Sequence, residues 1–136
     1  MGALAPVRIV AAVIRDTAGR VLLVRKRGSD TFIQPGGKRE AGETALDTLA
    51  RELSEELGVT LQPDSALALG HFSDAAVHET GHQVEAEVFA CAVEGMPQAS
   101  AEIEALTWVD PSALPPALCI APLSRNHILP RVAALG

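Results

Sequence analysis

Residues 37–59 read GKREAGETALDTLARELSEELGV, a glycine-containing loop followed by a segment with helical periodicity. From position 44 onward, apolar residues recur at intervals of three and four, which is typical of an amphipathic helix. Thr44, with Asp47 three residues later, predicts a capping box at the start, and Gly58 predicts the stop. The stretch therefore predicts a loop and then a helix whose apolar face is formed by Leu46, Leu49, Ala50, Leu53 and Leu57.

Three glutamates lie on the opposite face of this predicted helix. At about 100° per residue from Leu46, Glu52, Glu55 and Glu56 fall near roughly 240°, 180° and 280°. Like charges at this spacing repel one another, so a shared cation would stabilise them. Carboxylate oxygens without imidazole or thiolate favour Mg²⁺ or Mn²⁺. The alternative is a solvated surface, because surface helices usually carry charge on their outer face.

The rest of the composition limits the class of protein. A chain of 136 residues with 48% apolar and 21% charged residues predicts one folded domain and excludes intrinsic disorder. The net charge of -6 disfavours long nucleic acid as a partner. Two cysteines, Cys91 and Cys119, are too few for a disulfide framework, which favours a cytoplasmic location. No apolar run reaches the roughly 20 residues that a membrane span needs.

The flanking segments predict strands on both sides of the helix. Residues 7–15 and 21–26 are rich in β-branched side chains and are separated by turn residues, which predicts a hairpin. Further strands are expected at residues 66–72, 84–93 and 106–109, and a last helix, interrupted by Pro130, at residues 123–135. Strands before and after a central helix predict an α/β protein in which helices cover a mixed sheet.

The pattern of glycine, acidic and basic residues within residues 37–59 resembles the signature of a known family. Gly37, Glu43 and the run Arg51-Glu52-Leu53-Ser54-Glu55-Glu56-Leu57-Gly58-Val59 match the signature of the Nudix hydrolases at every fixed position. This resemblance implies a Nudix-type α/β/α sandwich with a mixed β-sheet and a catalytic loop-helix-loop, with residues 1–136 as a single domain. It also implies metal-dependent hydrolysis of a nucleoside diphosphate linked to another moiety.

The resemblance also implies roles for particular residues. The expected metal ion is Mg²⁺ or Mn²⁺. Its ligands would be the side chains of Glu52, Glu55, Glu56 and Glu102 and the backbone carbonyl of Gly36. Arg51 and Glu43 would brace the motif behind these ligands. Divalent ions can neutralise phosphate oxygens and ionise water, and Glu52 is our candidate for the group that accepts the proton of the water.

The substrate is predicted by elimination. The chain has no Tyr and lacks the secondary markers of subfamilies that act on dinucleoside polyphosphates, NADH or ADP-ribose. We therefore expect a small nucleoside triphosphate, cleaved to a monophosphate and pyrophosphate. Two alternative functions stay open: hydrolysis of ADP-ribose or a nucleotide sugar, and binding of a nucleotide as a sensor without turnover. A homodimer is also possible. Expected substrate-binding residues are Gly37, Lys38, Phe32 and Arg25, with Phe32 either stacking on a base or packing in the core.

Two residues depart from the pattern expected of enzymes specific for oxidised guanine. Gln34 replaces the apolar residue that commonly precedes Pro-Gly-Gly, and Leu118 stands where such enzymes can carry a purine-reading Asn. These departures weaken a prediction of that substrate.

A second motif suggests a different class of enzyme. His78-Glu79-Thr80-Gly81-His82 has the spacing of a zinc peptidase, with Glu102 as a conceivable third ligand. That spacing aligns the two imidazoles only on a helix, and Gly81 disfavours one. We therefore interpret the segment as a loop between strands that is able to contact substrate.

Overall fold

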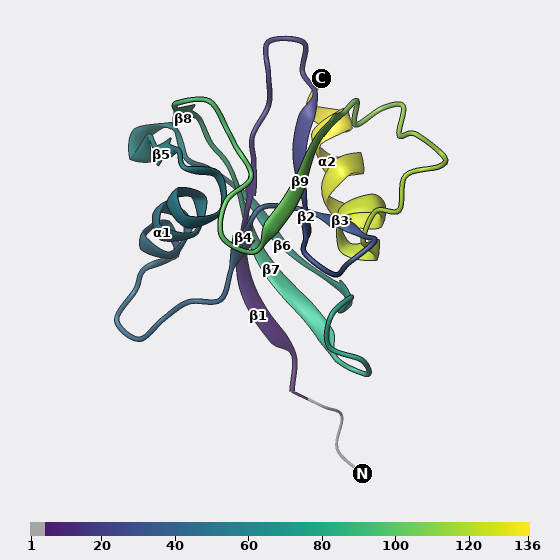
Figure 1. Cartoon of the computed structure of the whole chain (residues 1–136), viewed down its shortest axis with the longest axis horizontal. Coiled ribbons are helices and arrows are strands. Elements are labelled where there is room, and N and C mark those ends of the chain that lie inside the picture. Colours follow the sequence, from purple (N-terminus) through teal and green to yellow (C-terminus); the bar gives the residue numbers. More distant parts are fainter. Residues whose placement is uncertain (1–4) are drawn as a thin grey trace.

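The structure is a computed structural model and describes residues 5–136 (Figure 1). A four-stranded mixed sheet has the order β4-β1-β7-β6, a three-stranded antiparallel sheet has the order β3-β2-β9, and β5 pairs with β8. The strands are β1 (Val7–Val13), β2 (Val21–Lys26), β3 (Phe32–Ile33), β4 (Gly36–Gly37), β5 (Thr60–Leu61), β6 (Leu67–Ala75), β7 (Gln83–Ala90), β8 (Val93–Glu94) and β9 (Ile103–Val109). The helices are α1 (Ala45–Leu57), the 3₁₀ turn η1 (Pro63–Ser65), the π-helical turn η2 (Ser124–Ile128) and α2 (Leu129–Leu135).

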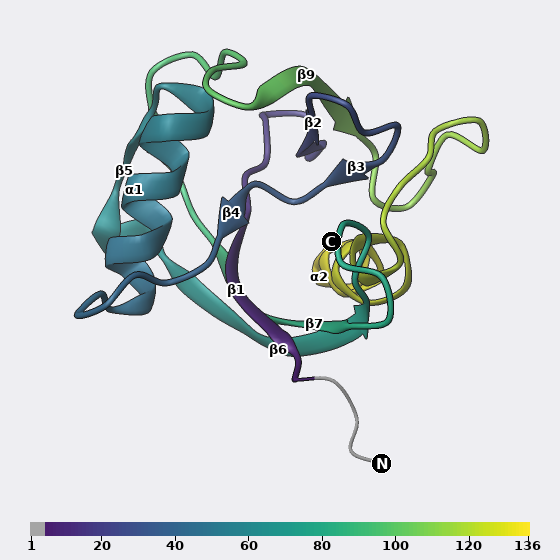
Figure 2. The ribbon, with the colours of Figure 1, turned by 60° about the horizontal axis from the view of Figure 1, so that its bottom comes forward.

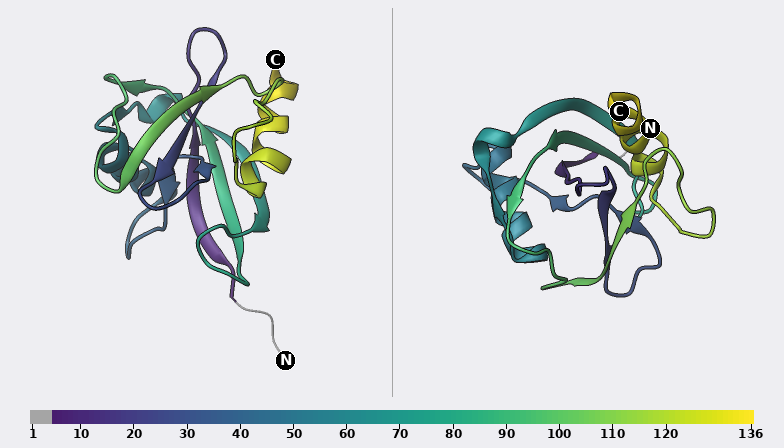
Figure 3. Two further views of the ribbon diagram at one scale, coloured as in Figure 1. Left: turned by 45° about the vertical axis from the view of Figure 1, so that its right-hand side comes forward. Right: turned by 90° about the horizontal axis from the view of Figure 1, so that it is seen from above.

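Two apolar cores lie on opposite faces of the central strands. Successive side chains of a strand point to opposite faces, so Val10 and Ala12 of β1 face α1 whereas Ala11 and Val13 face α2. Leu49, Leu53 and Leu57 of α1 complete the first core, and Leu129 and Val132 of α2 belong to the second. Figures 2 and 3 show the two helices on opposite sides of the sheets. The predicted α/β sandwich is confirmed.

Helix α1 begins and ends as its sequence predicts. The Thr44 side chain accepts a hydrogen bond from the Asp47 N–H at 3.1 Å, and the Asp47 carboxylate accepts one from the Thr44 N–H at 3.0 Å. Gly58 has φ +66° and donates its N–H to the Ser54 carbonyl, which ends the helix in a left-handed cap. The capping box thus sets the direction in which the chain leaves the glycine loop for the helix.

The buried face of α1 is rotated from the predicted apolar stripe. Leu49, Leu53 and Leu57 are completely buried, but Leu46, the centre of the predicted stripe, is only half-buried. Glu56 is buried as well, at 2% exposed. The placement of Glu56 on an exposed face was therefore wrong, because the loop around Gly36 and the chain at Ser100 cover this flank of the helix.

The predicted hairpin holds only next to its turn. Arg15 and Val21 form an isolated bridge, but β1 then pairs with β4 and β7 while β2 pairs with β3 and β9. Both strands alternate apolar residues toward the two cores, with Val21 and Leu23 of β2 on the α2 side and Leu22 and Val24 on the α1 side. The predicted last helix is also confirmed in position, although it begins as a π-helical turn before Pro130. Within residues 5–136, no helix is long and apolar enough to cross a membrane.

Candidate active site

Arg51 connects the glycine-rich loop to α1. Its guanidinium donates to both carboxylate oxygens of Glu43, at 2.7 and 2.9 Å, and to the Lys38 carbonyl at 3.0 Å. The Arg51 hydrogen bonds, together with that of the Glu40 N–H, lower the pKa of Glu43 to about 2. A bidentate pair of this kind fixes both partners in orientation. The loop that precedes α1 is therefore held rigidly against the helix.

The same guanidinium orients the first of the three glutamates. Arg51 donates to Glu52 Oε1 at 2.8 Å, and its Nη1 lies 3.8 Å from an oxygen of Glu55. Burial raises the pKa of Glu52 and outweighs the opposing effect of Arg51. Glu55 is different, because its side chain is 55% exposed and lies outside the cavity described below.

Glu56 is a buried carboxylate beneath the glycine loop. Its Oε1 accepts a hydrogen bond from the Gly36 N–H at 3.0 Å. Burial raises the pKa of Glu56 to about 8, and the negative charges of Glu52 and Glu102 add to the effect. An uncompensated anion at this depth is unfavourable, so a bound cation would stabilise it.

The two glycines before the helix are required for different reasons. Gly36 has φ +144°, and a side chain on it would collide with the Val10 backbone. At Gly37 the backbone is ordinary, but an added Cβ would lie 2.5 Å from the Glu52 carboxylate. Gly36 therefore allows β4 to pack closely against β1, and Gly37 allows the backbone to approach the Glu52 carboxylate.

Gly37→Ala is expected to impair activity more than stability. The added methyl group pushes the Glu52 carboxylate away from its place beside the loop, and we expect at least a tenfold loss of kcat/KM with a small change in Tm. Steady-state kinetics and thermal unfolding on the same preparation check this. An alanine variant with full activity would contradict the close approach.

A cavity of about 440 Å³ lies beside this region. Of the residues predicted as functional, those that line it are Gly36, Gly37, Lys38, Arg51, Glu52 and Glu102. The side chain of Lys26 also lines the cavity and lies 3.5 Å from Glu102. The cavity therefore combines carboxylates with lysine ammonium groups at one end.

Arg25 and Phe32 are not brought to this cavity. Arg25 instead bonds to the Ser29 carbonyl and to Glu104, each at 2.9 Å, and its guanidinium lies 5.8 Å from the centroid of the Phe32 ring. Phe32 packs against the α2 core. The structure thus gives these two residues a packing role and does not support their prediction as substrate-binding residues.

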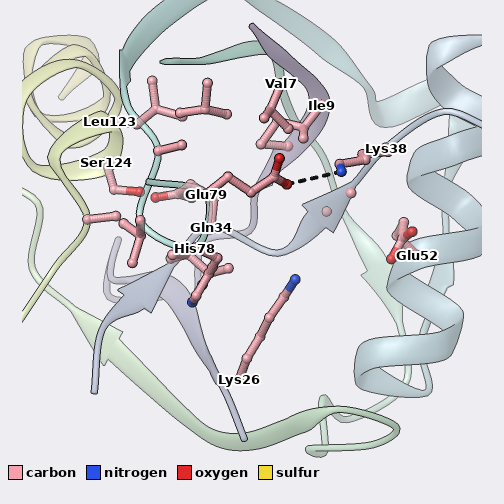
Figure 4. A pocket seen from close by; sticks show the side chains of 18 of the residues that line it. Val7, Ile9, Lys26, Gln34, Lys38, Glu52, His78, Glu79, Leu123 and Ser124 are labelled. Atoms are coloured by element: carbon pink, nitrogen blue, oxygen red, sulfur yellow. Dashed lines mark ion pairs between the residues drawn. The ribbon is translucent and has the colours of Figure 1, made fainter. Parts of the chain in front are cut away.

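Apart from the loop of the second motif, the remaining walls of the cavity come from residues that match no motif in the sequence. Val7 and Ile9 of β1 and Leu123 provide apolar surface, and Ser124 and Gln34 provide buried polar groups. The β6–β7 loop adds Glu79, which forms a 3.0 Å ion pair with Lys38 across the cavity (Figure 4). These wall residues come from four separate segments, and apart from Glu79 only alternation and loop position could have suggested them.

The zinc-peptidase interpretation is not supported by the β6–β7 loop. Residues 78–82 form bends and a turn, with no helix to align the imidazoles. His78 lies 3.2 Å from the Ser29 hydroxyl, whereas His82 lies 2.8 Å from the Ala5 carbonyl. The interpretation of this segment as a loop between strands is correct, and His78 and Glu79 line the cavity.

The carboxylates suit a hard divalent cation in type and charge. Glu52, Glu56 and Glu102 are close enough that the charges of Glu52 and Glu102 raise the pKa of Glu56. In their present rotamers, no three acidic, histidine or cysteine side chains of residues 5–136 are grouped to hold a metal ion. Glu52 is instead bonded to Arg51 and Glu56 to Gly36. Oxygen donors alone favour Mg²⁺ or Mn²⁺ over softer metals.

Comparisons with known proteins identify the family of this chain. The family model of the NUDIX domain matches residues 5–131. This chain therefore belongs to the Nudix family. The MutT protein of Methanosarcina mazei superposes with a TM-score of 0.77 at 26% sequence identity, covering 96% of this chain and 95% of that one.

Curated relatives match over shorter parts of their own length. A MutT-like protein of Streptomyces ambofaciens is 31% identical over 75% of this chain and 62% of that protein. An 8-oxo-dGTP diphosphatase of Haemophilus influenzae is 39% identical over 39% of this chain and 42% of that protein. An RNA pyrophosphohydrolase of Halorhodospira halophila is 43% identical over 45% of this chain and 33% of that protein. The matched parts thus span less than two thirds of each of these relatives.

Proposed function

We propose that this protein hydrolyses a phosphoanhydride bond of a small nucleotide, using Mg²⁺ or Mn²⁺, and that its substrate is a nucleoside triphosphate. The observation that carries the proposal is the composition of the cavity. Glu52 and Lys38 lie on one side of the cavity and the apolar side chain of Leu123 on the other (Figure 4), and Glu102 and Lys26 also line it. Phosphates fit the charged end, and a nucleobase fits the apolar end.

The residues at the charged end have distinct roles in this proposal. The ammonium groups of Lys26 and Lys38 bind phosphate oxygens, and Gly36 and Gly37 let the substrate approach the backbone. Glu52 accepts the proton of the attacking water, because it is the helix glutamate that lines the cavity. Glu52, Glu55, Glu56, Glu102 and the Gly36 carbonyl would hold the cation. The cation, when bound, neutralises phosphate charge and lowers the pKa of water.

The relatives support a phosphoanhydride substrate but differ in its identity. One is named for 8-oxo-dGTP and another for RNA. The net charge of -6 and the size of the cavity favour a free nucleotide for this chain over a long nucleic acid.

A panel of substrates tests this function. The protein is incubated with Mg²⁺ and with each of the common and oxidised deoxynucleoside triphosphates, ADP-ribose and a nucleotide sugar, and the products are identified by chromatography. We expect monophosphate and pyrophosphate from a triphosphate, and no turnover in EDTA. Release of orthophosphate, turnover of ADP-ribose or the sugar nucleotide alone, or binding without turnover would each contradict the proposed reaction.

A further inference from the structure

Gln34 carries an unsatisfied buried acceptor beside the cavity. This residue, between β3 and β4, is 6% exposed and lines the cavity. Its Nε2 donates a hydrogen bond to the Ala12 carbonyl at 2.9 Å. Its Oε1 is buried and has no hydrogen-bond partner among residues 5–136. An amide oxygen left in this state is unfavourable, so it requires an explanation.

The hydrogen bond to Ala12 determines which group Gln34 offers. Rotating the amide by half a turn would place Oε1 against the Ala12 carbonyl, so that two acceptors would face each other. The Nε2 is thus committed to β1, and the group that remains is an acceptor. A ligand can satisfy it only with an N–H or O–H donor.

The surroundings of Gln34 make this acceptor selective. Ala121 and Leu123 are buried at the same cavity, Ile9 adds apolar surface, and Ser124 is 1% exposed. Figure 4 shows Gln34 on the side of Leu123 and Ser124, across the cavity from Glu52. A hydrogen bond is stronger where water is excluded, and a mismatched group cannot find water as a substitute partner.

We propose that Gln34 is a specificity-determining residue whose Oε1 accepts a hydrogen bond from an N–H of the nucleobase. The site then favours a base that presents a donor at this position over one that presents a lone pair. Oε1 is covered by its neighbours, so binding requires a small rearrangement at this end of the cavity. The inference rests on the proposed function in assuming that a nucleotide places its base here.

Binding of matched nucleoside monophosphates tests the proposal without turnover. In CMP and UMP, and in AMP and IMP, the exocyclic N–H donor of one member is a carbonyl acceptor in the other, and the adjacent ring nitrogen changes in the opposite sense. In 8-oxo-dGMP and dGMP, N7 changes from an N–H donor to an acceptor, and C8 carries an oxygen only in the oxidised base. Titration calorimetry measures the Kd of each with the wild-type protein and with Gln34→Leu. Because only the member with an N–H opposite Oε1 of Gln34 satisfies this acceptor, we expect the wild type to prefer one member of at least one pair by about tenfold. In Gln34→Leu the ratio should fall to within about twofold of unity.

Control variants separate recognition from folding. Gln62→Leu makes the same change at an exposed glutamine outside the cavity and should keep the wild-type ratio. Gln34→Met serves if the leucine variant fails to fold, and thermal unfolding monitors both. The inference is overturned if the wild type binds both members of every pair equally, if no monophosphate binds, or if the Gln34 variants keep the ratio. A wild-type preference that Gln34→Leu abolishes, without hydrolysis of any triphosphate, would overturn only the proposed function.

Discussion

Glu56→Gln is expected to abolish hydrolysis and, in the absence of metal, to stabilise the protein at alkaline pH. The glutamine keeps the shape of the side chain and can still accept the Gly36 N–H. It removes a charge that the proposed cation site requires, so we expect at least a thousandfold loss of kcat. It also removes an anion that the fold buries at 2% exposure.

The pH dependence follows from the pKa of Glu56. Burial raises this pKa from 4.5 to about 8, so between these values the folded protein binds more protons than the unfolded chain. Metal-free wild type should therefore lose stability as pH rises from 4.5 to 8, by roughly 5 kcal/mol at most. Glu56→Gln should lack this loss, and Mg²⁺ should reverse it in the wild type.

Chemical unfolding in EDTA at pH 5, 7 and 9 measures this difference, with product release as the readout of activity. Glu55→Gln is the matched control, because it neutralises the neighbouring glutamate at a position whose side chain is 55% exposed. We expect its stability to follow the wild-type pH profile. Wild-type turnover in Glu56→Gln would contradict the assignment of Glu56 as a metal ligand. A wild-type dependence of stability on pH in Glu56→Gln would contradict the inference that ionisation of buried Glu56 destabilises the fold.

Leu53→Ala should have the largest effect on stability. Leu53 is completely buried and packs in the core between α1 and strands β1, β2 and β9. Truncation removes apolar contacts and leaves a cavity, which costs about 2 to 5 kcal/mol. Because Glu52 adjoins this position, residual activity at low temperature reports whether the helix keeps its place.

Leu46→Ala tests whether the buried face of α1 is the one that the structure shows. Leu46→Ala is the same substitution as Leu53→Ala and lies on the same helix, but the side chain of Leu46 is only half-buried. We expect a cost below about 1 kcal/mol, since surface substitutions usually have small effects. If Leu46→Ala and Leu53→Ala lower the free energy of unfolding in urea equally, the buried face of α1 is centred on Leu46 as the sequence predicts.

Much of the local structure followed from short-range patterns. The pairing of Glu43, which precedes the helix, with Arg51 is an exception, because it was implied by the resemblance to the family. The helix, its capping box and its glycine stop depend on residues three or four positions apart. Interactions at this spacing are set by helical geometry, which the sequence displays directly. Membership of the Nudix family and the α/β class followed from the same stretch and are confirmed. The metal-binding roles of the glutamates, the single domain over residues 1–136 and the homodimer stay predictions.

The sequence by itself therefore determined the loop, the helix and the charged groups that they present. Only the tertiary structure decided that Glu56 is buried, that β1 and β2 enter different sheets, and that Gln34 and Glu79 reach the cavity. The physical reason is that periodicity gives the angle of a side chain around its own element but not the element that covers it. The burial of a side chain depends on segments that are distant in the chain. Burial in turn sets the pKa of a carboxylate and decides whether an amide lacks a hydrogen-bond partner.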